Sequence, residues 1–241
     1  MNFLSHALPY LDQPLVAVCT AVPDWLSVID RKIRARERMV TAVLDQSASP
    51  NQGEVIDQDD EALQQVAKGI LAHIRDDHWF HGTAAFTETN LQLAVELRDR
   101  LPGDRGFRPM FLGHILIEVL LDAFWIRDQP ELGERYYELV EACPAETIER
   151  CVNQITGKPT DRLVTTIGRF AKSRFLFDYL DDERLLFRLN QVMQRVGLAE
   201  LPESLLPWIA NARELVESRR EQFLTPPNGT TNFPPIPRNH D

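Results

Sequence analysis

Cysteine is scarce in this chain of 241 residues, which contains three of them. They are Cys19, Cys143 and Cys151, and no two of them form a CxxC pair. An odd number of cysteines without paired spacing argues against a disulfide framework and is typical of a reducing compartment. We therefore expect a cytoplasmic protein with unpaired thiols.

Long apolar runs are also missing. No segment has eighteen or more consecutive apolar residues, so the sequence predicts no transmembrane helix. The first ten residues lack the basic start and the long apolar region of a secretory signal. Both observations agree with the expected cytoplasmic location.

Positive charge is in deficit, with 26 Lys and Arg against 36 Asp and Glu and a net charge of −10. A general nucleic-acid binder needs the opposite balance to neutralise phosphates, so that class is not expected. The basic residues nevertheless gather once, within eight positions, at Arg31, Lys32, Arg34, Arg36 and Arg38. This cluster is either a solvated helix face or a patch for phosphate or an acidic partner.

No convincing strand pattern occurs, whereas apolar residues recur at three- and four-residue steps over most of the chain. We predict an all-α protein, with one helical domain of about nine or ten helices over residues 1–224. Three of these helices are expected over residues 25–44, 160–179 and 202–223. Residues 46–60 are polar and predict a loop, and residues 225–241 hold five of the sixteen prolines and predict a disordered tail.

Three of the six histidines fall between residues 69 and 81. In a helix, His73, Asp77 and His81 lie four residues apart and share one face. Imidazole and carboxylate groups on one face suit zinc, manganese or iron. The alternative is a half-buried helix whose histidines are hydrogen-bonded core residues.

A second stretch repeats this spacing with His114, Glu118 and Asp122 inside a strongly apolar run. A carboxylate among Ile, Val, Leu and Phe is costly to bury unless a cation or a donor compensates it. We predict these three residues as further metal ligands. The alternative is that the two carboxylates pair with arginines across the bundle.

Two residues of the N-terminal segment complete the predicted metal shell. His6 lies among Phe3, Leu4 and Leu8, so it is expected to be buried. Asp24 follows Pro23 and is placed in the first turn of a new helix. A carboxylate at a helix start is also favoured by the helix dipole alone, which is the alternative for Asp24.

With these residues located, residues 1–125 resemble the bacterial acyl carrier protein phosphodiesterase family, helical enzymes related to HD-type metal-dependent phosphohydrolases. The start Met-Asn-Phe-Leu-Ser-His is similar to that family's Met-Asn-Phe-Leu-Ala-His. Asp24 matches its aspartate, Gly69-Ile70 with His73 and Asp77 matches Gly-Ile-x-x-His-x-x-x-Asp, and His114 matches the histidine of Asp-His-Phe-Leu. The chain departs from the family at Gly113 and His81, where the family has aspartates.

The resemblance implies an HD-like metal site and release of 4′-phosphopantetheine from acyl carrier protein. Our own hypothesis makes Asp77 and Glu118 the catalytic residues, with Glu118 or Asp122 as a further ligand or as general base and His81 as ligand or proton donor. Because Arg31 to Arg38 follow Asp24 on what is expected to be one helix, we predict that they lie at the rim of the metal site. Leu112-Gly113-His114 with Glu118 and Asp122 is also similar to the helix motif of zinc-dependent phospholipase C-like proteins. Both resemblances imply metal-assisted hydrolysis of a phosphodiester. The rival from another class is a non-catalytic helical binding module.

Overall fold

The regular structure of the protein is helical throughout the part that the computed structural model describes, which is residues 1–47, 58–101 and 108–237. The all-α prediction is therefore confirmed. The α-helices are α1 Phe3–Ala7, α2 Pro14–Cys19, α3 Val22–Ile29, α4 Glu37–Ser47, α5 Gln58–His81, α6 Ala84–Arg100, α7 Arg108–Asp128, α8 Pro130–Ala142, α9 Ala145–Thr156, α10 Leu163–Ser173, α11 Asp182–Arg195, α12 Leu206–Ser218 and α13 Arg220–Phe223. Short 3₁₀ helices cover Leu8–Tyr10, Phe175–Leu180 and Glu203–Leu205.

The described residues contain thirteen α-helices, more than the nine or ten predicted, because α1 was not among the expected helices and those expected over residues 25–44 and 202–223 each divide into two. The expected helix from Trp25 to Leu44 ends at Ile29, and α4 starts only at Glu37. Asp30 has an extended backbone, and its carboxylate accepts a hydrogen bond from the backbone N–H of Lys32 at 2.8 Å. Such a local side-chain bond competes with the helix and turns the chain.

A second expected helix, over residues 160–179, is broken at Arg174. This residue adopts a left-handed conformation with φ of 45° and ends α10. A third, over residues 202–223, divides into a 3₁₀ turn, α12 and α13. Apolar periodicity did not reveal these breaks, because it continues across them.

The chain divides into two compact units. The first unit consists of Met1–Ser5, His78–Gly133 and Phe175–Asp241, and the second of His6–Asp77 and Glu134–Arg174. The unit boundaries fall inside α1, α5 and α8, so each of these helices contributes residues to both units.

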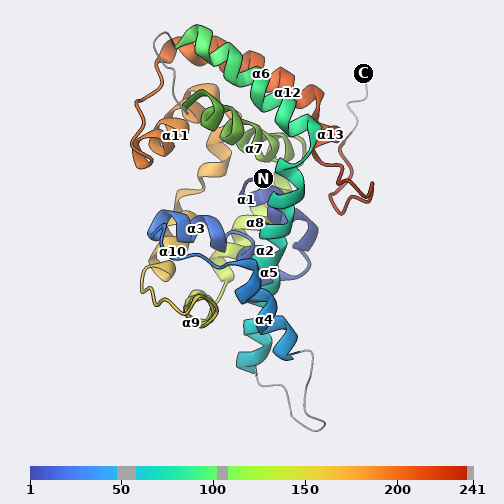
Figure 1. Ribbon diagram of the computed structural model, residues 1–241, viewed down its shortest axis with the longest axis vertical. Coiled ribbons are helices and arrows are strands. Elements are labelled where there is room, and N and C mark those ends of the chain that lie inside the picture. Colours follow the sequence, from blue (N-terminus) through green and yellow to red (C-terminus); the bar gives the residue numbers. More distant parts are fainter. Residues whose placement is uncertain (48–57, 102–107, 238–241) are drawn as a thin grey trace. The chain divides into compact units, whose positions relative to one another are not determined.

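The first unit is built on α7, against which α6 and α12 pack (Figure 1). Helix α7 is strongly apolar over most of its surface, and Leu116, Leu120, Phe124 and Trp125 are fully buried. A helix with so little polar surface is stable in water only when neighbours cover most of it. Its length and composition would also allow it to cross a membrane, but 72% of the apolar window is buried inside the protein, as in a core helix.

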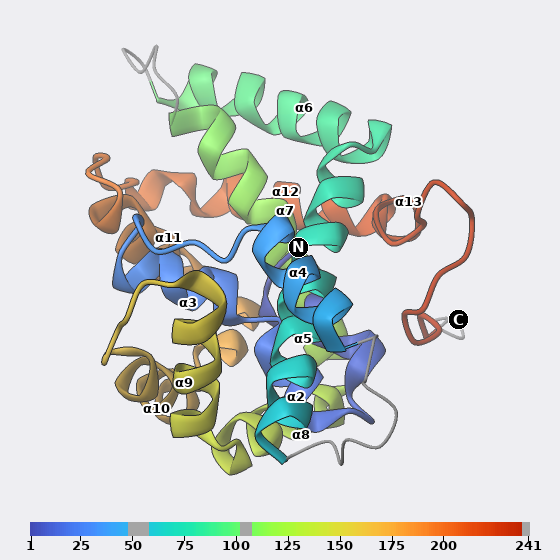
Figure 2. The ribbon, with the colours of Figure 1, turned by 60° about the horizontal axis from the view of Figure 1, so that its bottom comes forward.

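The second unit packs α10 against both α3 and α9, which Figure 2 shows close together. Phe170 of α10 contacts Trp25 of α3 edge to face, with ring centroids 5.5 Å apart. On α8, Tyr137 stacks on the same Phe170 ring at 5.6 Å. Aromatic contacts of this kind add stability beyond the area they bury, so Phe170 joins three helices of the unit.

The two polar segments predicted as irregular are described only in part. Residues 48–57 of the expected loop lie outside the described residues, as do residues 102–107 and 238–241. The described part of the C-terminal segment, residues 225–237, forms no helix, and the Phe233 ring stacks on Trp125 at 6.3 Å. Disorder of residues 225–241 in solution stays a prediction.

Candidate metal centres

The second unit brings His6, His73 and Asp77 together, as predicted. Helix α5 presents His73 and Asp77 one turn apart, and α1 supplies His6. The Nε2 of His6 lies 3.2 Å from Asp77 Oδ1, and the Nε2 of His73 lies 3.4 Å from Oδ2. The two imidazole rings stack with centroids 4.1 Å apart. One carboxylate thus lies between two imidazoles.

This arrangement fits a metal ion. Ligand atoms on one edge of a tetrahedral zinc site are about 3.3 Å apart, given metal–ligand distances near 2.0–2.1 Å, and the observed separations are 3.2 and 3.4 Å. The Nε2 of His6 is buried and has no hydrogen-bond partner despite its closeness to Asp77. A buried nitrogen left unsatisfied is costly, and a cation would satisfy it.

The electrostatics of the second unit also favour a cation. Burial alone lowers the pKa of His6, but the Asp76 and Asp77 carboxylates outweigh it and raise this pKa to about 9. Burial raises the pKa of Asp77, yet the His6 and His73 imidazoles hold it well below its ordinary value. The carboxylates therefore require a positive charge beside them, which either a proton on His6 or a divalent ion supplies.

Asp76 was missed by the sequence reasoning. Its Oδ2 lies 3.5 Å from Nδ1 of His6. The four-residue spacing from His73 selects Asp77 and not Asp76, and His6 is 70 residues away in the chain, so no local signal links them. A carboxylate beside the second ring nitrogen of a ligating histidine fixes the orientation of the ring and makes it a better ligand.

The first unit holds a second group, made of His81, His114 and Glu118. His81 lies at the end of α5, and His114 and Glu118 are one turn apart on α7. Both Nε2 atoms approach the same oxygen, Oε1 of Glu118, at 2.8 Å from His81 and 3.3 Å from His114. The Phe86 ring meets both imidazoles edge-on, at 4.8 and 4.9 Å, and fixes their positions.

The ionised form of the Glu118 side chain is strongly favoured. Burial raises the pKa of its carboxyl, but the Met1 amino group at 3.0 Å and the two histidines hold it well below its ordinary value. The histidine side chains are 29% and 36% exposed, whereas those of His6 and His73 are 0% and 7% exposed. The group of the first unit is thus the more accessible one, as catalytic metal sites with an open position are.

Asp122 was predicted as a metal ligand, and the structure corrects this assignment. Its carboxylate is fully buried and accepts hydrogen bonds from the backbone N–H groups of Leu4 and Ser5, the Ser5 hydroxyl and the Asn2 amide. These donors satisfy both oxygens at the start of α1. Asp122 anchors the N-terminal segment of the first unit and belongs to neither ligand group.

Asp24 also falls outside both ligand groups. It is in the first turn of α3, as expected, where the helix dipole favours a carboxylate. The arginine cluster was expected on the same helix and this prediction is wrong, because α3 ends at Ile29. All five basic residues are exposed, on the segment between α3 and α4 or in the first turn of α4: Arg31, Lys32, Arg34, Arg36 and Arg38.

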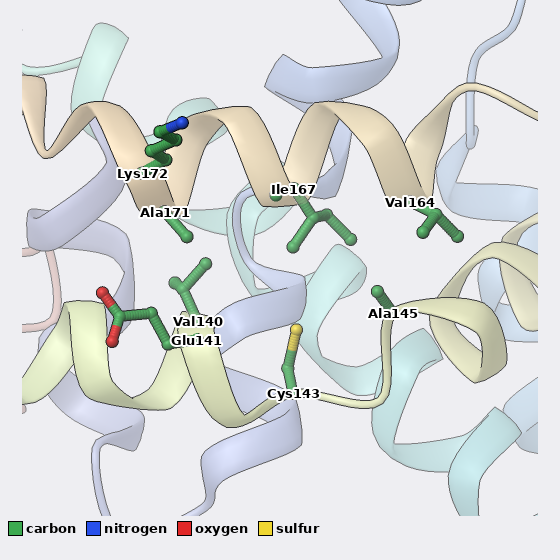
Figure 3. Close-up of a pocket in the computed structure, with 9 residues that line it drawn as sticks. Val140, Glu141, Cys143, Ala145, Val164, Ile167, Ala171 and Lys172 are labelled. Atoms are coloured by element: carbon green, nitrogen blue, oxygen red, sulfur yellow. The ribbon is translucent and has the colours of Figure 1, made fainter.

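A pocket of 440 Å³ in the second unit carries no comparable chemistry. It is lined mostly by aliphatic residues of α8, α9 and α10 together with Glu141 and Lys172, and the thiol of Cys143 is directed into it (Figure 3). Burial raises the pKa of that thiol to about 11. A thiol that stays protonated at neutral pH is a poor nucleophile and a poor metal ligand. All three cysteines are free, as predicted.

No family model, curated protein or solved structure matches this chain. The resemblance to the acyl carrier protein phosphodiesterases therefore stays a prediction. Functional inference depends on the two ligand groups themselves.

Proposed function

We propose that this protein is a metal-dependent phosphodiester hydrolase whose substrate binds at His81, His114 and Glu118 in the first unit. The observation that carries the proposal is that each compact unit brings two imidazole nitrogens and one carboxylate within 4.8 Å of one another. Two histidines and one carboxylate are a ligand set of hydrolytic zinc sites and of iron sites with open positions. Zinc, manganese or iron would suit both groups.

The accessible group is the better site for chemistry. When bound, a divalent ion supplies Lewis acidity, which lowers the pKa of water and withdraws charge from a phosphoryl oxygen. Glu118 and the two histidines would hold the ion, and Phe86 would keep both rings in place. The depressed pKa of Glu118 makes it a weak proton acceptor, so a role as ligand is favoured over the predicted role as general base.

The group of the second unit has a different character. His6 and His73 are almost completely buried, and both Asp77 oxygens face imidazoles. The depressed pKa again favours a ligand role for Asp77 over the predicted catalytic one. Buried ligand sets of this kind hold structural metals, which stabilise the fold. We assign this group to stability, with Asp76 orienting His6.

Hydrolysis of bis-p-nitrophenyl phosphate by the purified protein tests the proposal, with manganese or zinc added after dialysis against a chelator. His114→Ala and Glu118→Gln are expected to lose at least about 100-fold in kcat/KM, since even the loss of a residue that only supports a metal ligand typically costs about 10–100-fold. His78→Ala is the matched control, because His78 is an exposed histidine near the end of α5 and outside both groups. Activity that survives both substitutions would refute the assignment.

A second assay tests which phosphodiester is the substrate. The resemblance implies acyl carrier protein, so the intact mass of holo-acyl carrier protein is measured after incubation with the metal-loaded protein. Loss of the 4′-phosphopantetheine group would support that substrate. Hydrolysis of the small diester alone would support a phosphodiesterase acting on another substrate. Absence of both activities, with metal still bound, would favour a non-catalytic helical module.

A further inference from the structure

The basic segment between α3 and α4 is fixed in place by sequence-distant residues of the second unit. Arg162, just before α10, donates a hydrogen bond to the carbonyl of Ile29 at 2.8 Å. Lys158, after α9, donates to the carbonyl of Lys32 at 2.9 Å. Arg162 thus occupies the carbonyl end of α3, where positive charge is favoured, and Lys158 holds the segment that follows.

The segment is strongly positive in an acidic protein. Residues 30–36 hold four cationic side chains, and Asp30 is their only carboxylate. The carboxylate of Asp30 is already engaged with the backbone N–H of Lys32. Lys158 and Arg162, which bind backbone carbonyls of residues 32 and 29, add two further positive charges. An anion near this segment therefore meets attraction, although the whole protein carries −10.

A pocket lies in this positive region. It has a volume of 210 Å³, and Pro23, Leu26 and Ile33 form apolar parts of its wall. Two arginines line it as well, Arg31 and Arg34. The Nε of Arg34 donates to the carbonyl of Arg31 at 3.2 Å, which ties the two residues together at the pocket. Guanidinium groups bind phosphate through planar, paired hydrogen bonds, and the apolar wall suits a non-polar group.

We propose that this pocket binds a small phosphate monoester that carries a compact apolar group, with the phosphate on the guanidinium group of Arg34 and the apolar group on Pro23, Leu26 and Ile33. The volume admits a single ring or a short branched chain and is too small for a nucleotide or a peptide segment, since pockets for drug-sized ligands are about 300–1,000 Å³. The binding needs no metal, so it does not depend on the proposed hydrolase function.

Isothermal titration with phenyl phosphate, inorganic phosphate and phenol tests the proposal. The protein carries His114→Ala and is dialysed against a chelator, so that neither hydrolysis nor a metal contributes. One equivalent of phenyl phosphate is expected to bind, at least about tenfold more tightly than inorganic phosphate or phenol, because each lacks one half of the interaction. Absence of phenyl phosphate binding would overturn the proposal whatever the hydrolase assays show.

Variants separate the pocket from general surface charge. Arg34→Ala is expected to weaken phenyl phosphate binding about tenfold or more. Arg38→Ala is the matched control, because Arg38 is an exposed arginine of the same run that does not line the pocket, and it is expected to change binding less than twofold. Equal losses in both variants would mean non-specific attraction and would overturn the proposal.

Filling the pocket provides an independent test. Ser27 is exposed and lines the pocket, so Ser27→Phe places a ring in it without changing any charge. This variant is expected to lose phenyl phosphate binding while its melting temperature stays near that of the parent. Retained binding would contradict the proposal. So would Arg34-dependent sedimentation with phosphatidic acid vesicles in the absence of phenyl phosphate binding, because that result would assign the segment to a membrane surface.

Discussion

The carboxylate of Asp122 accepts two hydrogen bonds from Ser5, one from its backbone N–H at 2.8 Å and one from its hydroxyl at 2.7 Å. Asp122 is in the middle of α7, and Ser5 is in the first helix of the chain, 117 residues earlier. The backbone N–H of Leu4 adds a further bond at 3.0 Å. A carboxylate at the N-terminus of a helix satisfies donors that the helix itself leaves free. Asp122 therefore ties the N-terminal segment to the core helix of the first unit.

This relationship predicts that Asp122→Ala destabilises the protein without removing a metal ligand. A buried hydrogen bond to a charged group contributes about 1.5–3 kcal/mol, and its loss leaves buried donors unsatisfied. We expect a fall of about 3 kcal/mol or more in the free energy of unfolding, measured by urea denaturation. Ser5→Ala removes one of these bonds and should cost about 1 kcal/mol. Bound metal, measured by mass spectrometry, should be unchanged in Asp122→Ala, and loss of one equivalent would restore Asp122 as a ligand.

Metal addition is expected to raise the stability of the protein through both ligand groups. An ion that binds only the folded state at 100 times its Kd stabilises by about 2.7 kcal/mol. The parent should bind about two equivalents of zinc, one for each group that provides a ligand set. His73→Ala and His114→Ala should each lose one equivalent and the corresponding part of the rise in melting temperature. His78→Ala should behave as the parent, and an unchanged metal content in both ligand variants would rule out the two centres.

Gly69 allows α5 to approach α2 closely within the second unit. A Cβ atom at this position would lie 2.5 Å from the carbonyl oxygen of Val16 and 2.7 Å from the Cβ of Cys19. Gly69→Ala should therefore force the two helices apart and cost about 1–3 kcal/mol of unfolding free energy. It should also weaken metal binding at His73, one turn further along α5.

Gly168 of α10 is the matched control for this substitution. A Cβ atom there would meet nothing within 4 Å. Because alanine is the better helix former by about 1 kcal/mol, Gly168→Ala is expected to raise the unfolding free energy. Thermal and urea denaturation of the two variants should give effects of opposite sign. Equal effects would show that the α5–α2 contact is looser than the structure has it.

The first unit contains a nearly buried ion pair whose contribution should depend on pH. Asp128 and Arg220 have side chains only 11% and 4% exposed and are hydrogen-bonded to each other. Burial raises the pKa of the Asp128 carboxyl, but Arg127 and Arg220 outweigh it and lower this pKa below its ordinary value of 3.8. A lowered pKa in the folded state means that the stabilisation is present above the ordinary value and is lost as pH falls through the lowered one.

Asp128→Asn is accordingly expected to cost about 3–5 kcal/mol at pH 7, since it leaves the Arg220 charge buried without its partner. The difference from the parent should narrow when urea denaturation is repeated at successively lower pH below 4. Glu138→Gln serves as control, because Glu138 forms an exposed pair with Arg135 at 3.5 Å and such pairs contribute about 1 kcal/mol or less. A difference that stays constant with pH would contradict the ionic origin of the effect.

The sequence by itself determined that the protein is helical and which histidines are close to which carboxylates along one helix. Residues four apart on a helix meet because of its period, so His73 with Asp77 and His114 with Glu118 follow from spacing alone. The spacing of the cysteines also showed that no two of them form a CxxC pair. These features depend on contacts between near neighbours in the chain.

Only the tertiary structure decided how these pairs are completed. His6 joins His73 and Asp77 from 67 residues away, and Asp76 contributes through its position beside His6. Asp122 follows Glu118 by four residues, just as Glu118 follows His114. Its carboxylate nevertheless accepts hydrogen bonds from the start of α1 and belongs to neither ligand group. Spacing determines which side chains share a helix face, but the partner facing each of them depends on packing between segments far apart in the sequence. The carbonyl end of α3 also depends on a distant residue, because Arg162, 133 residues further along the chain, donates a hydrogen bond to the carbonyl of Ile29.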